Sequence, residues 1–272
     1  MIAAADELRK RRSFKGKLIL AAVALEETGD GTGIKKVLDT LGEKPDVVLI
    51  GEATNLDVCL GHRGKVEFLL ETLGSTAHSS NPGNGINAIL LMNEFMSAWQ
   101  QVELPNHEIL GQCTSALTNI RCTPGKPFII PDRCFVNFDR RYLPGENPEK
   151  IQDEVLCVLE RLSARNPNFK FKLQVVQTMP PFLIPKGNSF VPPLLQAVRT
   201  HSREPKLRGW LFGTDGTYIV NNYRIPTIGF GPGNETFAHT SADHVPIKHL
   251  QICTRVYRDF VLNVGGQVPI SV

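Results

Sequence analysis

The sequence predicts an α/β protein whose mostly parallel sheet is interrupted by an inserted ferredoxin-like unit. Apolar runs at residues 18–25 and 45–50 have the length and character of strands buried on both faces, and a helical pattern separates them. Residues 64–177 instead follow a β-α-β-β-α-β pattern, with alternating strands and two helices. A further apolar run at 225–230, followed by a helix, returns to the first pattern.

Composition narrows the class of protein. The 272 residues can fill one large or two smaller domains, and 21% charged with 42% hydrophobic residues is ordinary for a globular chain. The net charge of +3 is too small to indicate a nucleic-acid partner. No run approaches the ~20 apolar residues of a membrane span, so we expect neither nucleic acid nor membrane as a partner. The six cysteines form no C-x-x-C pair, and no secretory signal is evident, so we expect reduced thiols in a cytoplasmic protein.

The first domain is predicted to be discontinuous, covering residues 1–62 and 179–272. It opens with a helix over residues 1–12, whose basic end is favourable for the helix dipole. The buried strand at 18–25 follows and ends in two adjacent carboxylates. The other predicted elements of this domain are a helix over 34–41, a strand over 45–50, a helix over 188–202, a strand over 225–230 and a helix over 249–264.

Residues 63–178 form the predicted inserted domain. The proline and glycine residues of TPGKPFIIPD mark the connection between its two middle strands, and a proline near residue 148 begins its second helix. The predicted elements are strands over 65–73, 111–122, 133–142 and 169–177, with helices over 84–101 and 148–165.

Acidic and histidine side chains follow three of the predicted strands of the first domain. Glu26 and Glu27 end the first strand, Glu52 follows the second, and His239 lies in the loop after the third. Carboxyl ends of parallel strands open on one crevice, and zinc accepts both carboxylate oxygen and imidazole nitrogen. Each residue taken alone has an ordinary alternative: the glutamates fit a solvated turn, and a lone histidine fits the core or the surface.

Six segments together resemble the dinuclear zinc exopeptidases and deacylases, a family that includes acetylornithine deacetylase, succinyl-diaminopimelate desuccinylase, aminoacylase and glutamate carboxypeptidase. The resemblance covers nearly the whole chain, in order and in spacing. Its segments are ALEETGDGTG, LIGEATN, GSTAHSSNPGNGINAI, VNFDRRYLPGE, GTDGTYI and GFGPGNETFAHTSAD.

The resemblance implies a metal-dependent hydrolase of amide bonds in N-acyl amino acids or small peptides. It assigns Glu26 as the general base that moves a proton from metal-activated water to the leaving amine. It assigns Glu27 and His239 as zinc ligands and Glu52 as the ligand of the other zinc. The family uses two zincs per subunit, and cobalt or manganese could replace them.

The resemblance also implies substrate contacts and a homodimer through the inserted domain. His78 matches the histidine that reaches across the dimer to the substrate carbonyl. Asn119 and Arg141 resemble polar groups that hold the substrate, and Asp215 and Gly216 belong to a substrate-side loop. Arg141 could bind a substrate carboxylate with its planar guanidinium, or it could form a salt bridge with nearby Asp139.

The chain departs from the family's pattern at its beginning. The family carries a His-x-Asp motif and a metal-bridging Asp before the helix that corresponds to residues 1–12, and no histidine here is followed at the second place by Asp. We therefore expect a catalytic domain that is incomplete at its N-terminus, with weak metal binding and slow turnover or none. The alternative is an inactive remnant or a non-catalytic dimerisation or binding module of the same family.

Two other activities are disfavoured by the sequence. The glycines at 229, 231 and 233 are interrupted by Pro232 and are not followed by a helix with Gly-Lys-Ser or Gly-Lys-Thr, which argues against a nucleotide site. A serine nucleophile would need a G-x-S-x-G elbow, which the chain lacks.

Overall fold

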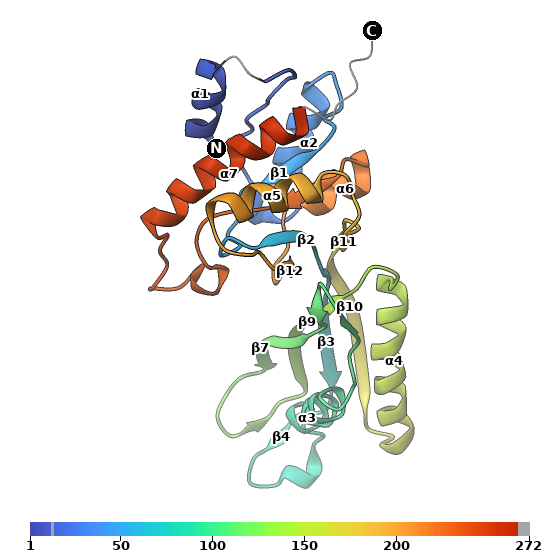
Figure 1. Cartoon of the computed structure of the whole chain (residues 1–272). Helices are drawn as coiled ribbons and strands as arrows, with labels where there is room; N and C mark the ends of the chain where they lie inside the picture. The colour runs from blue at the N-terminus through green and yellow to red at the C-terminus, as the bar shows by residue number, and fades with distance from the viewer. Residues whose placement is uncertain (12–13, 266–272) are drawn as a thin grey trace. The chain divides into compact units, whose positions relative to one another are not determined.

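The computed structural model describes residues 1–11 and 14–265, which form two compact units (Figure 1). The α/β unit contains Met1–His62, Glu108–Gly111 and the chain from Phe182 onwards. The inserted unit contains Arg63–His107 and Gln112–Pro181. The first unit therefore takes a short return segment at 108–111 that the sequence pattern assigned to the inserted domain, and the chain re-enters it three residues later than predicted, at 182 instead of 179.

The α/β unit is built on a five-stranded mixed sheet. The strands β1 (Val48–Ile50), β13 (Thr227–Gly229), β2 (Val58–His62) and β11 (Phe182–Leu183) lie side by side in this order, and β12 (Leu207–Trp210) also pairs with β2. The pairs β1–β13 and β12–β2 are parallel and contain most of the paired residues of the sheet. Strands β11 and β13 pair with β2 in antiparallel fashion. The predicted α/β class is thus confirmed.

Helices pack around this sheet and against one another. The helices are α1 (Ile2–Arg11), α2 (Thr32–Thr40), α5 (Val191–His201), α6 (Gly216–Tyr223) and α7 (Ile247–Gly265). Helix α7 packs along α5 and buries Val256 and Phe260 (Figure 1). Its Tyr257 hydroxyl donates a hydrogen bond of 2.8 Å to the carbonyl of Phe230, which fixes α7 to the chain just after β13. No helix in the described ranges is long and apolar enough to cross a membrane.

The inserted unit has the ferredoxin-like order that the sequence predicts. Its elements are β3 (Gly64–Leu73), α3 (Ala88–Trp99), β7 (Ser115–Thr123), β9 (Arg133–Tyr142), α4 (Pro148–Arg165) and β10 (Lys170–Met179). The antiparallel sheet has the order β10-β3-β9-β7, with β7 and β10 at its edges. Two small pairs accompany it: β4 (Ala77–His78) with β8 (Ile129–Ile130), and β5 (Asn106–His107) with β6 (Gly111–Gln112).

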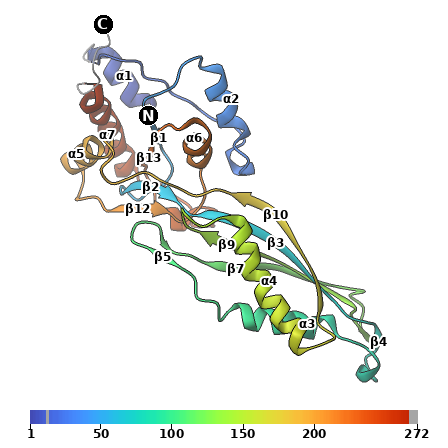
Figure 2. The ribbon, with the colours of Figure 1, turned by 90° about the vertical axis from the view of Figure 1, so that its right-hand side faces the viewer.

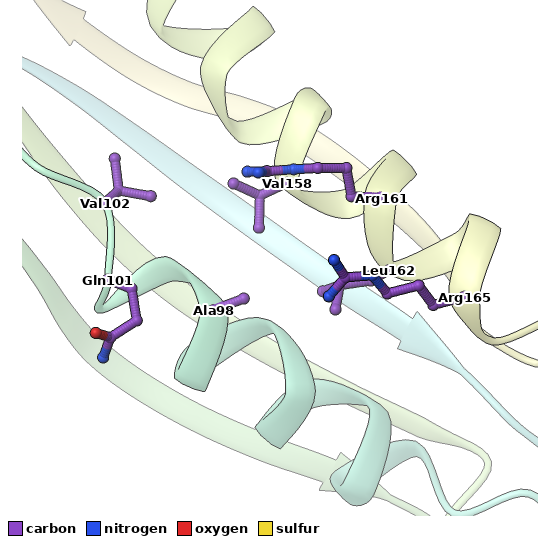
Figure 3. Close-up of a pocket in the computed structure, with 7 residues that line it drawn as sticks. All are labelled: Ala98, Gln101, Val102, Val158, Arg161, Leu162 and Arg165. Carbon is purple, nitrogen blue, oxygen red and sulfur yellow. The ribbon is translucent and has the colours of Figure 1, made fainter.

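Both helices of the inserted unit pack on one face of its sheet (Figure 2). Asn87 and Asn147 begin them by accepting backbone N–H bonds with their side chains. The core beneath contains an aromatic cluster in which Phe68 and Phe138 stack with ring centroids 5.1 Å apart. A cavity of about 370 Å³ lies between the helices (Figure 3), lined by Ala98, Gln101, Val102, Val158, Arg161, Leu162 and Arg165. It contains none of the predicted site residues.

The predicted buried strand at residues 18–25 is wrong. The chain there is not assigned to any strand, and most of its apolar side chains are exposed, including Leu18, Leu20 and Leu25. In the described part of the chain β1 pairs only with β13, so no strand supplies backbone partners or a covering layer for this segment. The segment is apolar, but its burial would need a neighbouring element, which a local sequence pattern cannot show.

The exposure of residues 18–25 predicts that two leucine truncations in the same unit will lower the free energy of unfolding by different amounts. Leu60 in β2 is fully buried, whereas Leu20 is 45% exposed. Leu60→Ala should lower the free energy of unfolding by about 2–5 kcal/mol, because it leaves a cavity in the core. Leu20→Ala should cost about 1 kcal/mol or less. Denaturant unfolding of both variants measures the difference, and equal losses would show that residues 18–25 are buried in solution.

Candidate functional site

Glu26 and Glu27 lie in a single 3-10 turn, Glu26–Thr28, instead of at the end of a strand. Both flanking residues have left-handed backbone, with φ of 63° at Leu25 and 68° at Gly29, so the chain reverses sharply around the two carboxylates. The Tyr218 hydroxyl of α6 donates a hydrogen bond of 2.5 Å to the Gly29 carbonyl. The turn is therefore positioned by α6 as well as by its own backbone.

Glu52 lies two residues beyond β1, as the sequence predicts. The chain after β13 packs directly against it, because a Cβ added at Gly231 would lie 2.1 Å from the Glu52 carbonyl oxygen. The buried Thr54 hydroxyl bonds both the N–H and the carbonyl of Gly231, at 3.0 and 3.2 Å. Only glycine at position 231 permits this approach, which holds the start of the loop that carries His239 against the backbone of Glu52.

His239 follows the 3-10 turn Glu235–Phe237 and has a positive φ of 60°. Its Nε2 lies 3.9 Å from a carboxylate oxygen of Glu27, and both side chains are about four-fifths exposed. Glu235 anchors this turn through a hydrogen bond of 2.7 Å from the Arg208 guanidinium. His239 lies in the loop after β13, and nine residues separate it from the end of that strand.

Burial and like charges both raise the pKa values of this group, and burial is the larger cause. Desolvation raises the pKa of Glu26 to about 7, and the carboxylates of Glu52, Asp215 and Glu27 add to this, while His239 opposes it. Desolvation also raises the pKa of Glu52, with a further contribution from Glu27. The turn at 26–28, the loop after β1 and the start of α6 therefore bring four carboxylates within electrostatic reach of one another.

This donor set suits a cation. Carboxylate oxygens and an imidazole nitrogen are ligands of zinc and of similar divalent ions, and a positive charge would favour the ionised carboxylates against both the burial and the repulsion that raise their pKa values. In the residues that the structure describes, no three of these side chains already converge closely enough to hold an ion. The residues fit a metal by their chemistry, and the Nε2 of His239 lies 3.9 Å from a carboxylate oxygen of Glu27.

Asp215 belongs to the carboxylate group, which sequence reasoning missed when it assigned this residue to a substrate-side loop. Burial raises its pKa, and the charges of Asp30 and Glu52 raise it further while Lys35 lowers it. The sequence offers one signal for this placement: Asp215 follows the strand β12 and precedes α6, as an acidic residue after a strand does elsewhere in this unit. Its neighbour Gly216 packs against Phe182, because an added Cβ would lie 2.6 Å from that ring.

In the inserted unit, His78 lies on β4 and is exposed. The Ser80 backbone N–H donates to His78 Nδ1 at 3.2 Å, and the Ser80 hydroxyl lies 2.7 Å from the same nitrogen. A backbone N–H can only donate, so Nδ1 accepts and the neutral ring carries its proton on Nε2. This tautomer presents a hydrogen-bond donor to solvent, as a partner for a carbonyl oxygen.

Asn119 and Arg141 lie on neighbouring elements of the same sheet. Asn119 is exposed on the edge strand β7, next to a register shift between Leu117 and Asn119. Arg141 on β9 forms a salt bridge of 3.2 Å with Asp139, which is the alternative that the sequence left open for it. The roles of His78, Asn119 and Arg141 toward a substrate stay predictions.

Comparisons with known proteins agree with this architecture. The model of the M20 peptidase dimerisation domain matches residues 60–167. Protein YgeY of Escherichia coli is 28% identical to this chain over 253 residues. The aligned region covers 88% of this chain and 63% of YgeY. Acetylornithine deacetylase of Buchnera aphidicola is 25% identical over 261 residues, covering 93% of this chain and 66% of its own. The chain thus spans slightly less than two thirds of each relative.

A solved structure supports the same fold. The YXEP protein of Bacillus subtilis, described as a dinuclear metal binding peptidase of the M20 family, has a TM-score of 0.73 at 15% identity, covering 98% of this chain and 70% of its own. The fold and the matched domain define a two-unit chain with a peptidase dimerisation domain inserted in an α/β unit. Residues 60–167 match the peptidase dimerisation domain, and the chain is similar in sequence to acetylornithine deacetylase and in fold to an M20 peptidase.

The charge cluster predicts a pH-dependent gain in stability for Glu26→Gln. The folded pKa of about 7 lies above the ordinary 4.5, so ionising Glu26 opposes folding. This cost is absent below pH 4.5, grows as the pH rises, and is complete above about pH 7. Removing the charge should stabilise the chelator-treated protein by about 1 kcal/mol at pH 8, after allowance for solvent screening, and hardly at all at pH 4.5.

Thermal unfolding at the two pH values measures this gain. Glu160→Gln is the control, because Glu160 is an exposed glutamate on α4 in the other unit. A gain at pH 8 that is no larger than the control's would contradict the crowding of charge around Glu26.

Proposed function

We propose that this protein is a metal-dependent hydrolase of amide bonds in N-acyl amino acids or small peptides. The observation that carries the proposal is the pKa of about 7 for Glu26, next to the Glu27–His239 pair. A carboxylate with this pKa can accept and release a proton near neutral pH, which amide hydrolysis requires. Homology to deacetylases and M20 peptidases supports the same class of reaction.

Glu27, Glu52 and His239 are the side chains that we propose hold the metal. Zinc is the proposed ion, two per subunit in the complete site, with cobalt or manganese as replacements. When bound, such an ion supplies Lewis-acid polarisation of a carbonyl oxygen and activates water. The raised pKa of Glu52 supports this assignment, since a nearby cation would favour its ionised form.

Glu26 is the proposed general base. At neutral pH it is divided between its two protonation states, so it can take a proton from the attacking water and return it to the nitrogen of the leaving amine. Asp215 supports this role, because its negative charge helps to keep the pKa of Glu26 high. Glu26 therefore depends on its neighbours for the pKa that suits proton transfer.

Substrate recognition is proposed to come from the inserted unit. His78 offers its Nε2 proton to the substrate carbonyl, and Asn119 provides a polar side chain. Arg141 would bind a substrate carboxylate by exchanging it for Asp139, to which it is bound in the structure. A substrate that carries a carboxylate is therefore expected. A cytoplasmic location, predicted from the sequence, is part of the same proposal.

The proposal predicts separate effects of two substitutions. With zinc, cobalt or manganese added, Glu26→Gln should lower kcat on N-acyl amino acids or dipeptides by roughly 10²–10⁴-fold, because the proton carrier is lost, while metal affinity is retained. His239→Ala should lower metal affinity itself. Assays of hydrolysis with calorimetric metal titration measure both. Metal binding without any hydrolysis by the unsubstituted chain would favour a non-catalytic binding module instead.

We also propose a homodimer through the inserted unit, with β7 at the interface. The matched dimerisation domain supports it, and exposed apolar side chains cluster along β7 and the loop after it: Leu117, Ile120, Phe128 and Ile129. An unpaired edge strand with apolar neighbours is a surface that another copy can cover.

A charged residue on each edge of the sheet tests this interface. Ile120→Lys on β7 should convert dimer to monomer in light scattering at micromolar concentration, because a buried lysine has no partner there. Val176→Lys, an equally exposed position on the opposite edge strand β10, should leave the dimer intact. Loss of the dimer in Val176→Lys alone would move the interface to β10.

A further inference from the structure

Two cysteine thiols of the inserted unit face each other across neighbouring strands. Cys122 on β7 and Cys134 on β9 are directly paired in the register. Their sulfur atoms lie 3.2 Å apart, with both thiols reduced. Directly opposed residues of an antiparallel pair have Cα atoms about 4.5–5.5 Å apart, which is within the range that a disulfide spans. Joining the sulfurs needs a movement of only about 1 Å.

We propose that Cys122 and Cys134 are a thiol–disulfide exchange site, in which a small-molecule disulfide such as oxidised glutathione closes a cross-strand disulfide. This inference goes beyond the proposed hydrolase and does not depend on it. It uses a pair of side chains that have no part in the candidate metal site.

The two thiols differ in access, which sets the order of the steps. Cys122 is partly exposed, whereas Cys134 is buried in the core of the inserted unit. Burial raises the pKa of the Cys134 thiol to about 12, and the neighbouring Cys122 adds to the shift. The more accessible Cys122 thiolate is therefore the group that begins exchange.

The exchange has two steps. Cys122 first loses its proton, and its sulfur attacks one sulfur of the small disulfide, releasing one small thiolate and leaving a mixed disulfide on Cys122. Cys134 then gives its proton to a thiolate and attacks the Cys122 sulfur, which releases the second small thiol. The protein loses two electrons and two protons, and the small disulfide takes both to become two thiols.

The position of the pair suggests what oxidation would change. The pair lies near the last residue of β7 and the first residue of β9. Residues 124–132 form the loop that joins these two strands. This loop carries β8, which pairs with β4, so that His78 lies opposite Ile129. Further backbone bonds tie it to the same region, including Ser79 N–H to the Phe128 carbonyl at 2.8 Å. A disulfide at the base of loop 124–132 would restrain β8 and, through it, the strand β4 that carries His78.

Peptide mapping of the full chain tests the site. The protein is equilibrated with reduced and oxidised glutathione, alkylated and digested with trypsin, which cleaves after Arg121, Arg133 and Arg140. Lys126 is followed by proline and resists cleavage. The expected product is a disulfide between the peptides 122–133 and 134–140, lighter by two hydrogen atoms than the two free peptides together. Failure to form this link even in excess oxidised glutathione would overturn the proposal.

Variants separate the two steps. Cys134→Ala should stop at the glutathione adduct on Cys122, and Cys122→Ser should leave Cys134 unmodified in the folded protein. Cys157, an exposed cysteine on α4, is the control: Cys157→Ser should form the cross-strand link at the unsubstituted rate. A link that fails in Cys157→Ser would show that Cys122 and Cys134 do not exchange by themselves.

Hydrogen exchange measures the consequence. In the oxidised protein, amide exchange in residues 77–79 and 128–131 should slow several-fold relative to the reduced protein, while α4 stays unchanged. Formation of the disulfide with unchanged exchange in both segments would contradict the restraint of the His78 region.

Discussion

The close contact between Gly231 and the carbonyl of Glu52 holds the candidate site together. Thr54 bonds both backbone groups of Gly231, and the N–H of Phe230 donates to the Ile50 carbonyl at 3.1 Å. These bonds join the segment after β1 to the segment after β13, so two distant parts of the chain leave the sheet at one place. The carboxylate of Glu52 and the loop of His239 are positioned by this contact, which a side chain at position 231 would break.

Charge crowding is the second constraint, and it opposes stability. Holding ionised Glu26 in a partly buried position near three other carboxylates costs free energy, and the fold tolerates this cost because backbone bonds and the Tyr218 hydroxyl fix the turn from outside the cluster. A group of side chains that lowers stability and brings no structural benefit is typical of a functional site. The arrangement suits both the binding of a cation and the transfer of a proton.

The inserted unit is organised differently. Its sheet and two helices form a complete core of its own, with aromatic rings between the layers. Three of the groups discussed above lie away from the middle of this core: His78 on a two-residue strand, Asn119 on the edge strand, and the cysteine pair at the base of a hairpin. A rigid core with functional groups at its margin is what a unit needs if it both dimerises and contacts a ligand.

The sequence by itself determined the elements whose signals are local. Alternation and capping predicted β9 and α4 to the residue, and the order β-α-β-β-α-β predicted the ferredoxin-like sheet. The motifs also predicted the family and named Glu26, Glu27, Glu52 and His239 as one group. Only the tertiary structure decided that residues 18–25 are exposed, that Asp215 joins the carboxylates, and that Cys122 faces Cys134. Burial, pKa and strand register depend on neighbours distant in sequence, and a local pattern carries no information about which neighbours are present.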